Sequence, residues 1–119
     1  MRYVVPGASG FVGRMLIDIL INNKRDVLVI GRNKDSLSKL FRNIDVAGYD
    51  EFEGLLKQDD VIVNLAVINN NKHTSLETMR QVNVTLACTL AKAAAAAGAT
   101  RFVNVSSIHA LDPSQSSHY

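Results

Sequence analysis

Short apolar runs alternate with amphipathic stretches along the 119 residues of the chain. The runs are rich in β-branched residues and have the length of buried strands. Strands that are apolar throughout are typical of parallel sheets covered on both faces. Five strands are therefore expected, the third being the weakest: 3–5, 27–30, 44–47, 61–66 and 102–105.

Segments with apolar residues at helical spacing separate these strands. Helices are expected from residue 12 to about 22, in a short segment that uses Leu37, Leu40 and Phe41, in one or two turns that contain Phe52, Leu55 and Leu56, and from about 76 to 97. Asn33 or Asp35 can cap the second helix and Asp50 the third. Alanine is the best helix former, so the run 93–97 is interpreted as helix that stops at Gly98. The alternation predicts a Rossmann-type α/β fold with a five-stranded parallel sheet in the order 3-2-1-4-5.

The composition fits one globular domain that binds no nucleic acid. Hydrophobic residues make up 47% of the chain and charged residues 20%, and the net charge of +2 comes from scattered side chains. The chain has no basic cluster and few aromatic residues, which argues against nucleic acid as a partner.

Cellular context can be inferred from the cysteine and from the apolar runs. Cys88 is the single cysteine and falls in a helical pattern, where a buried small side chain is favoured over a nucleophile or ligand. The absence of an internal disulfide suits a reducing cytoplasm. The chain enters its first strand without a charged leader, and no apolar run approaches the length of a membrane span. A cytoplasmic protein without a membrane partner is expected.

Three glycines, Gly7, Gly10 and Gly13, lie between the first strand and the first helix. The first permits a tight turn, the second lets a pyrophosphate approach the backbone, and the third lets the helix pack close to the strand. Unpaired N–H groups at the helix N-terminus then face the phosphates. A plain surface turn is the alternative, but the strand before and the helix after favour a dinucleotide-binding loop.

The residue after the second strand bears on the choice of cofactor. In dinucleotide folds an acidic residue there accepts a hydrogen bond from the ribose 2′-OH, whereas arginine pairs with a 2′-phosphate. This chain has Gly31 and Arg32 there, with Lys34 nearby and no carboxylate. NADP is therefore favoured over NAD. The alternative is that Arg32 is only a solvated loop charge.

Further candidates follow the fourth and fifth strands. Asn64, Leu65 and Ala66 close the fourth strand near the switch point where ligands bind in such folds, although Asn64 could equally satisfy its own loop. Ser107 follows the fifth strand, where serines also commonly form turns. Tyr119 would need a nearby cation to act as a base, and none follows it. The three histidines show no ligand spacing, so no metal site is expected.

Four segments together resemble the NAD-dependent epimerase/dehydratase family, the extended short-chain dehydrogenases that act on nucleotide sugars. They are 7–13, 61–66, 82–84 and 101–107. The resemblance implies cofactor contacts along the glycine loop and after the fourth strand. It also implies that Ser107 polarises the substrate and that Tyr119 matches the catalytic tyrosine. The cofactor-binding residues so expected are Gly7, Ser9, Gly10, Phe11, Val12, Gly13, Arg32, Asn64, Leu65 and Ala66.

The chain departs from the family pattern in three places. The family tyrosine begins a Tyr-x-x-x-Lys motif, whose lysine would lie beyond Tyr119. The interval from Ser107 to Tyr119 is shorter than is usual, and Asp45 and Asp50 lack the spacing of the family's Asp-x-x-Asp element. We expect 1–119 to be an incomplete NAD(P)-binding domain without its substrate lobe. In a full-length homo-oligomeric enzyme it would serve a nucleotide-sugar substrate, and alone it would be inactive.

Two other functions remain open at this point. The chain could be a non-enzymatic NAD(P)-binding module that senses cofactor without turning it over. It could also be an interaction fragment whose exposed sheet edge pairs with another chain and whose cofactor site is vestigial.

Overall fold

The fold is an alternation of strands and helices. The computed structural model describes residues 1–66 and 76–105, apart from the side chains of 76–80 and 82. The strands are β1 (Arg2–Pro6), β2 (Asp26–Gly31), β3 (Asp45–Gly48), β4 (Val61–Asn64) and β5 (Arg101–Asn104). The helices are α1 (Phe11–Asn22), α2 (Lys34–Leu40), α3 (Phe52–Leu55) and α4 (Leu76–Ala97).

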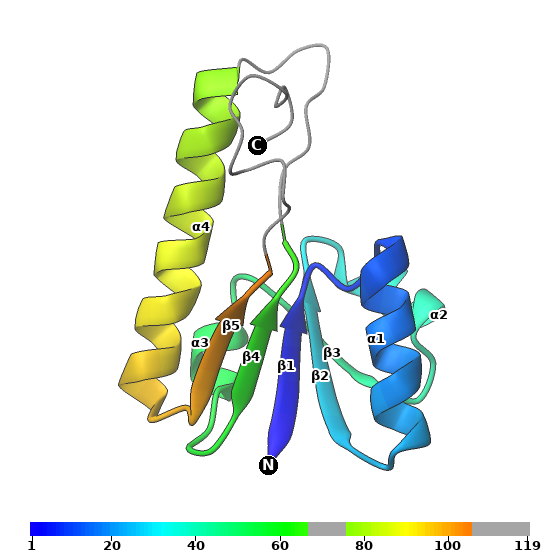
Figure 1. The fold of residues 1–119 in the computed structure, drawn as a ribbon. Helices are drawn as coiled ribbons and strands as arrows, with labels where there is room; N and C mark the ends of the chain where they lie inside the picture. The colour runs from blue at the N-terminus through cyan, green and yellow to red at the C-terminus, as the bar shows by residue number, and fades with distance from the viewer. Residues whose placement is uncertain (67–75, 106–119) are drawn as a thin grey trace.

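All five strands run parallel in one sheet, in the order β3-β2-β1-β4-β5. The strand order predicted from the sequence is thus confirmed (Figure 1). β1 is central and pairs with β2 on one side and β4 on the other. The carboxyl ends of the strands consequently meet along one edge of the sheet.

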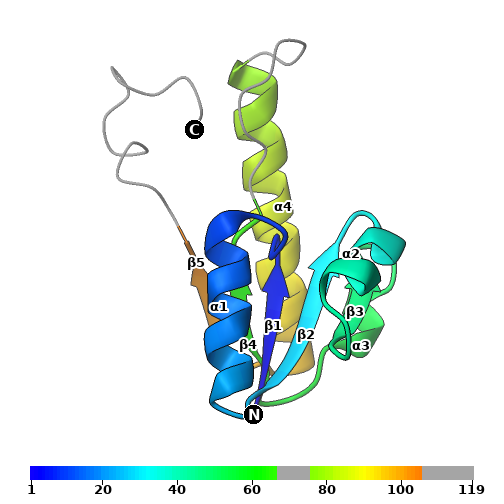
Figure 2. The ribbon, with the colours of Figure 1, turned by 90° about the vertical axis from the view of Figure 1, so that its right-hand side faces the viewer.

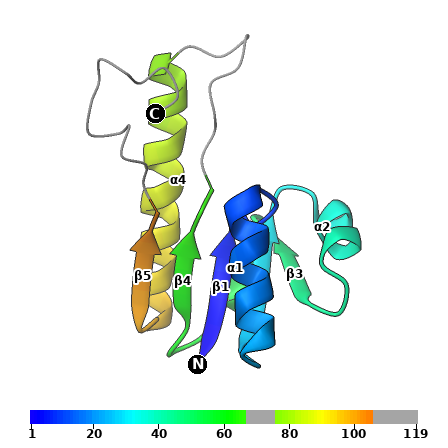
Figure 3. The same cartoon turned by 45° about the vertical axis from the view of Figure 1, so that its right-hand side comes forward.

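Helices cover both faces of this sheet. α1 and α2 lie over one face, and α3 and α4 lie over the other (Figures 2 and 3). Successive strand residues point to opposite faces, so Val4 packs toward α3 and α4 while Val5 packs toward α1 and α2. Leu28 and Val29 divide in the same way. The apolar runs of the sequence therefore contribute to two separate hydrophobic cores, one on each face of the sheet.

Strand ends differ from the predicted ones by one or two residues. β4 stops at Asn64 rather than Ala66, because the Asn64 Oδ1 accepts from the Ala66 N–H (3.0 Å) and turns the chain. Asn33 rather than Asp35 is the N-cap of α2, with its Oδ1 accepting from the Ser36 N–H at 3.0 Å. The N-cap of α3 is Glu51, so the expectation that Asp50 caps this helix was wrong.

The apolar pattern of α1, formed by Val12, Met15, Leu16, Ile19 and Leu20, is only partly buried, since Leu20 is buried and Leu16 packs on the core. Gly13, Ile17 and Leu20 are buried against the sheet. Val12, Met15 and Ile19 belong to the pattern as well, but they are half or more exposed. Their side of the helix therefore faces away from the sheet.

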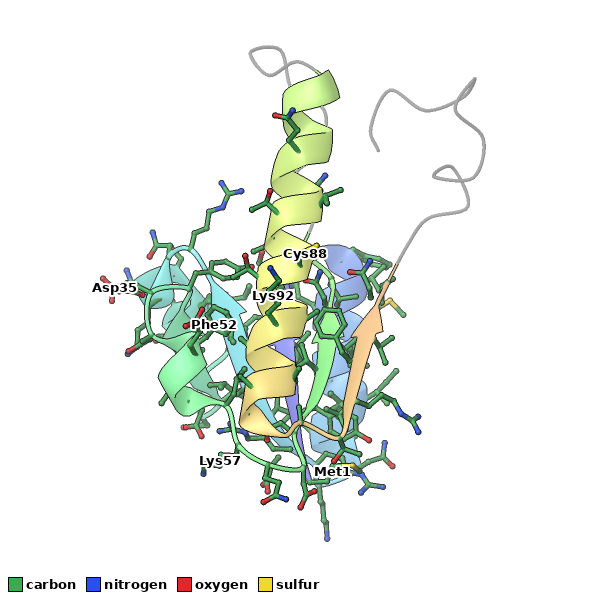
Figure 4. All side chains as sticks on the ribbon, turned by 90° about the vertical axis from the view of Figure 1, so that its left-hand side faces the viewer. Met1, Asp35, Phe52, Lys57, Cys88 and Lys92 are labelled. Carbon is green, nitrogen blue, oxygen red and sulfur yellow. The ribbon has the colours of Figure 1, made fainter. Side chains whose placement is uncertain are left out.

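The expectation that Cys88 is buried was wrong, since the side chain is exposed. Leu90 and Ala94 are the residues that α4 buries. At about 100° per residue, a position two residues from Leu90 lies on the far side of the helix. Figure 4 looks onto this side of the molecule, where Cys88 and Lys92 belong to the outer surface. None of the described helices combines the length and apolar character needed to cross a membrane.

The amino edge of the sheet carries a buried ion pair. The Arg2 guanidinium donates to both carboxylate oxygens of Asp60, at 3.2 Å and 2.8 Å. Asp60 is 2% exposed and also accepts from the Lys57 N–H. Arg2 further donates to the Leu55 carbonyl at 2.7 Å. This network ties the start of β1 to the turn that precedes β4.

Candidate functional site

The candidate site lies at the carboxyl edge of the sheet, where the ends of β1 and β4 come together. The chain after β1 leads into a helix on one face, whereas the chain after β4 leads to a helix on the other (Figure 1). Such a divergence of connections is where ligands bind in open parallel sheets. The Leu65 N–H donates to the Pro6 carbonyl at 2.9 Å, and the Gly7 N–H donates to the Ile30 carbonyl at 3.1 Å. These bonds fix the base of the site.

The backbone conformation at position 7 requires glycine whether or not a ligand binds there. The φ of Gly7 is +79°, in the left-handed region that glycine favours. A Cβ at this position would lie 2.5 Å from the Cα of Ala66. Gly7 therefore lets the turn after β1 pass directly against the segment that leaves β4.

Gly10 and Gly13 have opposite surroundings. A Cβ on Gly13 would lie 2.5 Å from the Cα of Ala8, so this glycine permits the close approach of α1 that the sequence predicts. A Cβ on Gly10 would meet no atom within 4 Å. Packing within the described residues does not explain the glycine at position 10. A side chain there would occupy the space above the loop, which is the space a pyrophosphate uses in a dinucleotide fold.

The N-terminus of α1 opens onto the same space. Gly10 is its N-cap and offers no side-chain acceptor to the first-turn N–H groups, and the first turn contains no acidic residue. These N–H groups and the positive end of the helix dipole favour an anion. Ser9, Phe11 and Val12 are exposed around the loop, Phe11 to 80%.

Both polar atoms of the Asn64 side chain form hydrogen bonds within the protein. Asn64 is 2% exposed. Its Oδ1 accepts from the Ala66 N–H, and its Nδ2 donates to the Asn104 Oδ1 at 2.8 Å. The structure thus supports the alternative that Asn64 satisfies its own loop, and the residue acts here by shaping the segment at Leu65 and Ala66. Both of these are half-buried and border Gly7.

A second part of the site lies at the ends of β2 and β3, which are paired through Gly31 and Gly48. Arg32 follows Gly31 and is exposed. Tyr49 follows Gly48 and packs edge-on against Phe52, with ring centroids 6.2 Å apart. Burial raises the pKa of Tyr49, and the nearby charge of Arg32 acts in the opposite direction. Tyr49 therefore presents a neutral phenol beside Arg32.

Carboxylates also reach this corner, which sequence reasoning missed. Glu51 Oε1 accepts from the Gly48 N–H and pairs with Lys34 Nζ, both at 3.1 Å. Asp50 lies over Gly48, because a Cβ there would be 2.5 Å from the Asp50 Oδ1. The predicted strand order could have indicated these carboxylates. It makes β2 and β3 neighbours, so the residues that follow the two strands come to one corner.

The remaining predicted site residues are not placed by the structure. Ser107 and Tyr119 lie outside the described residues. Within the described ranges, no group of three or more histidine, cysteine, aspartate or glutamate side chains could hold a metal ion.

Comparison with known proteins gives one family for this fold and site. The model of the NAD-dependent epimerase/dehydratase family matches residues 3–118. The match includes the glycine loop, the end of β4 and the end of β5.

Individual relatives agree with this match. The chain is 32% identical to the UDP-glucose 4-epimerase of Vibrio cholerae over 113 residues, which cover 88% of the chain and 34% of the relative. It is 31% identical to UDP-glucuronic acid decarboxylase 1 of Arabidopsis thaliana over 96 residues, covering 76% and 22% of the two chains. The chain thus spans about a third or less of these curated relatives. A crystal structure of the Bordetella bronchiseptica enzyme WbmG with NAD and UDP matches at a TM-score of 0.67 and 25% identity, over 87% of this chain and 36% of that one.

Proposed function

We propose, because this chain belongs to the NAD-dependent epimerase/dehydratase family, that its carboxyl sheet edge is the NAD(P)-binding part of an enzyme acting on a nucleotide sugar. The observation that carries the proposal is the contrast between the two glycines of the loop. Gly13 is needed for helix packing, whereas the space beside Gly10 is open. That open space lies at the uncapped N-terminus of α1 and suits the pyrophosphate of a dinucleotide.

Each part of the site then has a role toward the cofactor. The first-turn N–H groups of α1 bind the pyrophosphate, and Gly10 leaves room for it. Leu65 and Ala66 line the end of β4 and are held in place by Asn64. When bound, the nicotinamide supplies hydride transfer. The residues of this chain bind and orient the cofactor.

A preference for NADP over NAD is proposed from Arg32. Within the described residues this guanidinium forms no ion pair, so it is free to bind a 2′-phosphate bidentately. Tyr49 beside it offers a neutral donor that does not repel the phosphate.

The nucleotide-sugar substrate and the catalytic residues are proposed on the family and its relatives. The Vibrio cholerae relative is an epimerase of UDP-glucose by name, and WbmG was crystallised with NAD and UDP. Ser107 is proposed to polarise the sugar oxygen and Tyr119 to exchange its proton, on the resemblance alone.

Titration calorimetry with NADPH and NADH tests the cofactor part of the proposal. The parent protein should bind both, and Gly10→Val should abolish binding while circular dichroism shows an unchanged fold. Gly54→Val is the matched control, because a Cβ on Gly54 in α3 also meets no atom within 4 Å. This control should bind as the parent does. Equal affinities in the parent and in Gly10→Val would overturn the assignment of the loop.

A further inference from the structure

We infer that Glu51 sets how strongly this protein prefers NADPH to NADH, by holding the Lys34 ammonium away from the 2′-phosphate. The inference rests on the proposed function, because it concerns the same cofactor edge. It adds a residue from the neighbouring strand to the determinants of specificity. Glu51 follows β3, so its effect on specificity cannot be found from the residues that follow β2.

The first step is the position of Glu51. Its Oε1 accepts from the Gly48 N–H at 3.1 Å and pairs with Lys34 Nζ at 3.1 Å. Gly48 ends β3 and is the register partner of Gly31, which ends β2. The carboxylate therefore bridges the exits of two adjacent strands. Its backbone bond anchors it there, so it is held close to the ammonium.

The second step is the charge state of the pair. The hydrogen bond from the Gly48 N–H, followed by that from Lys34, holds the pKa of Glu51 below its ordinary value. Glu51 is consequently ionised at neutral pH and competes with any phosphate for the Lys34 ammonium. Asp50 adds a second carboxylate at the same corner. The corner thus contains carboxylates as well as the cations Arg32 and Lys34.

The third step compares the two cations. Arg32 forms no ion pair within the described part of the chain and can meet a 2′-phosphate at once. Lys34 must first leave Glu51. The side chain of Lys34 is 55% exposed, so its release needs no rearrangement of the core. In the parent protein, selectivity for the phosphate therefore rests on Arg32 alone, and Lys34 is a latent contact.

The Glu51→Gln substitution separates the two roles of Glu51. A glutamine oxygen can still accept from the Gly48 N–H, but the charge that holds Lys34 is gone. NADPH affinity should rise about fivefold, the gain expected from one exposed charge pair, and NADH affinity should stay within about twofold. The alternative role, in which Glu51 itself accepts from the ribose 2′-OH, predicts weaker NADH binding in this variant.

The experiment is a double-mutant cycle read by titration calorimetry with NADPH and NADH. Lys34→Ala alone should change neither affinity by more than about twofold, and Lys34→Ala combined with Glu51→Gln should return NADPH affinity to the parent value. Glu53→Gln is the matched control for charge, since Glu53 is exposed on α3 and pairs with no cation among the described residues. It should leave the ratio of the two affinities unchanged.

The outcomes separate this inference from the function on which it rests. If the parent binds both cofactors and Glu51→Gln leaves the affinity ratio unchanged, the inference is overturned and the proposed function stands. It is overturned in the same way if Lys34→Ala alone weakens NADPH binding, or if Glu51→Gln weakens NADH binding. A parent that binds neither cofactor would overturn both.

Discussion

The Asn64 side-chain amide donates to the Asn104 Oδ1 across 2.8 Å, joining the ends of β4 and β5. The same Asn64 side chain accepts from the Ala66 N–H, and the backbone of Ala66 borders Gly7. The segment that faces the glycine loop is thus held in place from the edge strand of the sheet.

Replacing Asn64 by alanine should lower the free energy of unfolding by about 2 kcal/mol, because the half-buried Ala66 N–H and the Asn104 side-chain amide lose their partner. Cofactor affinity should fall as well, because the segment at Leu65 and Ala66 is no longer fixed. Asn104→Ala should cost about 1 kcal/mol, since the bond to Ala66 remains. Urea unfolding followed by circular dichroism checks both values. Equal costs in the two variants would contradict the role given to the Ala66 bond.

Adding one methyl group to the loop should affect the free energy of unfolding very differently at Gly13 and at Gly10. Gly13→Ala should lower the free energy of unfolding by about 2 to 3 kcal/mol, because its Cβ would press on the backbone of Ala8. Gly10→Ala should be neutral within about 0.5 kcal/mol, because its Cβ meets open space. Thermal unfolding of the two variants side by side measures the difference. A tolerated Gly13→Ala would show that α1 can move away from β1 at little cost.

Removing the guanidinium of Arg32 should erase the proposed preference for NADPH. Arg32→Ala should weaken NADPH binding about tenfold and leave NADH binding nearly unchanged, since only NADPH carries the 2′-phosphate. Lys39→Ala removes another exposed cation, from the last turn of α2, and controls for net charge. A parent protein with equal affinities for both cofactors would contradict the NADP assignment.

The ion pair of Arg2 and Asp60 should matter for stability rather than for binding, since it lies at the amino edge of the sheet. Arg2→Met keeps the length of the side chain and leaves the Asp60 carboxylate buried without its cation. We expect a loss of about 3 kcal/mol in the free energy of unfolding, measured in urea. Arg25→Met, at an exposed arginine, should cost less than about 0.5 kcal/mol. Cofactor affinity should not change in either variant while the protein remains folded.

The edge strand β5 leads us to expect self-association of the chain. Val103 is 39% exposed on this strand, and β5 pairs only with β4 in the described sheet. An unpaired edge strand presents backbone N–H and C=O groups with which another chain can pair. Light scattering should show a mass that rises with concentration, and Val103→Lys should reduce it. A strictly monomeric parent protein would contradict this expectation.

The sequence by itself determined the fold class, the strand order and the separate roles of the glycines at 7 and 13. These features follow from local rules. Apolar runs and helical spacing identify the elements, and their alternation predicts a parallel sheet with right-handed crossovers. The glycine loop after the first strand favours the strand order of dinucleotide-binding folds. A positive φ combined with a close approach of two backbones, as at Gly7, leaves no room for a side chain and is met by glycine.

Tertiary structure decided which side of α1 is covered, how Asn64 is used and which charges meet beside Arg32. Val12, Met15 and Ile19 share an apolar pattern with Leu16 and Leu20, yet only Leu16 and Leu20 lie on the side that packs against the sheet. Asn104 lies 40 residues from Asn64. Glu51 meets Lys34 only because β2 and β3 pair in register through Gly31 and Gly48. Periodicity along a chain reports only local geometry, whereas these contacts depend on distances between segments that the sequence pattern does not contain.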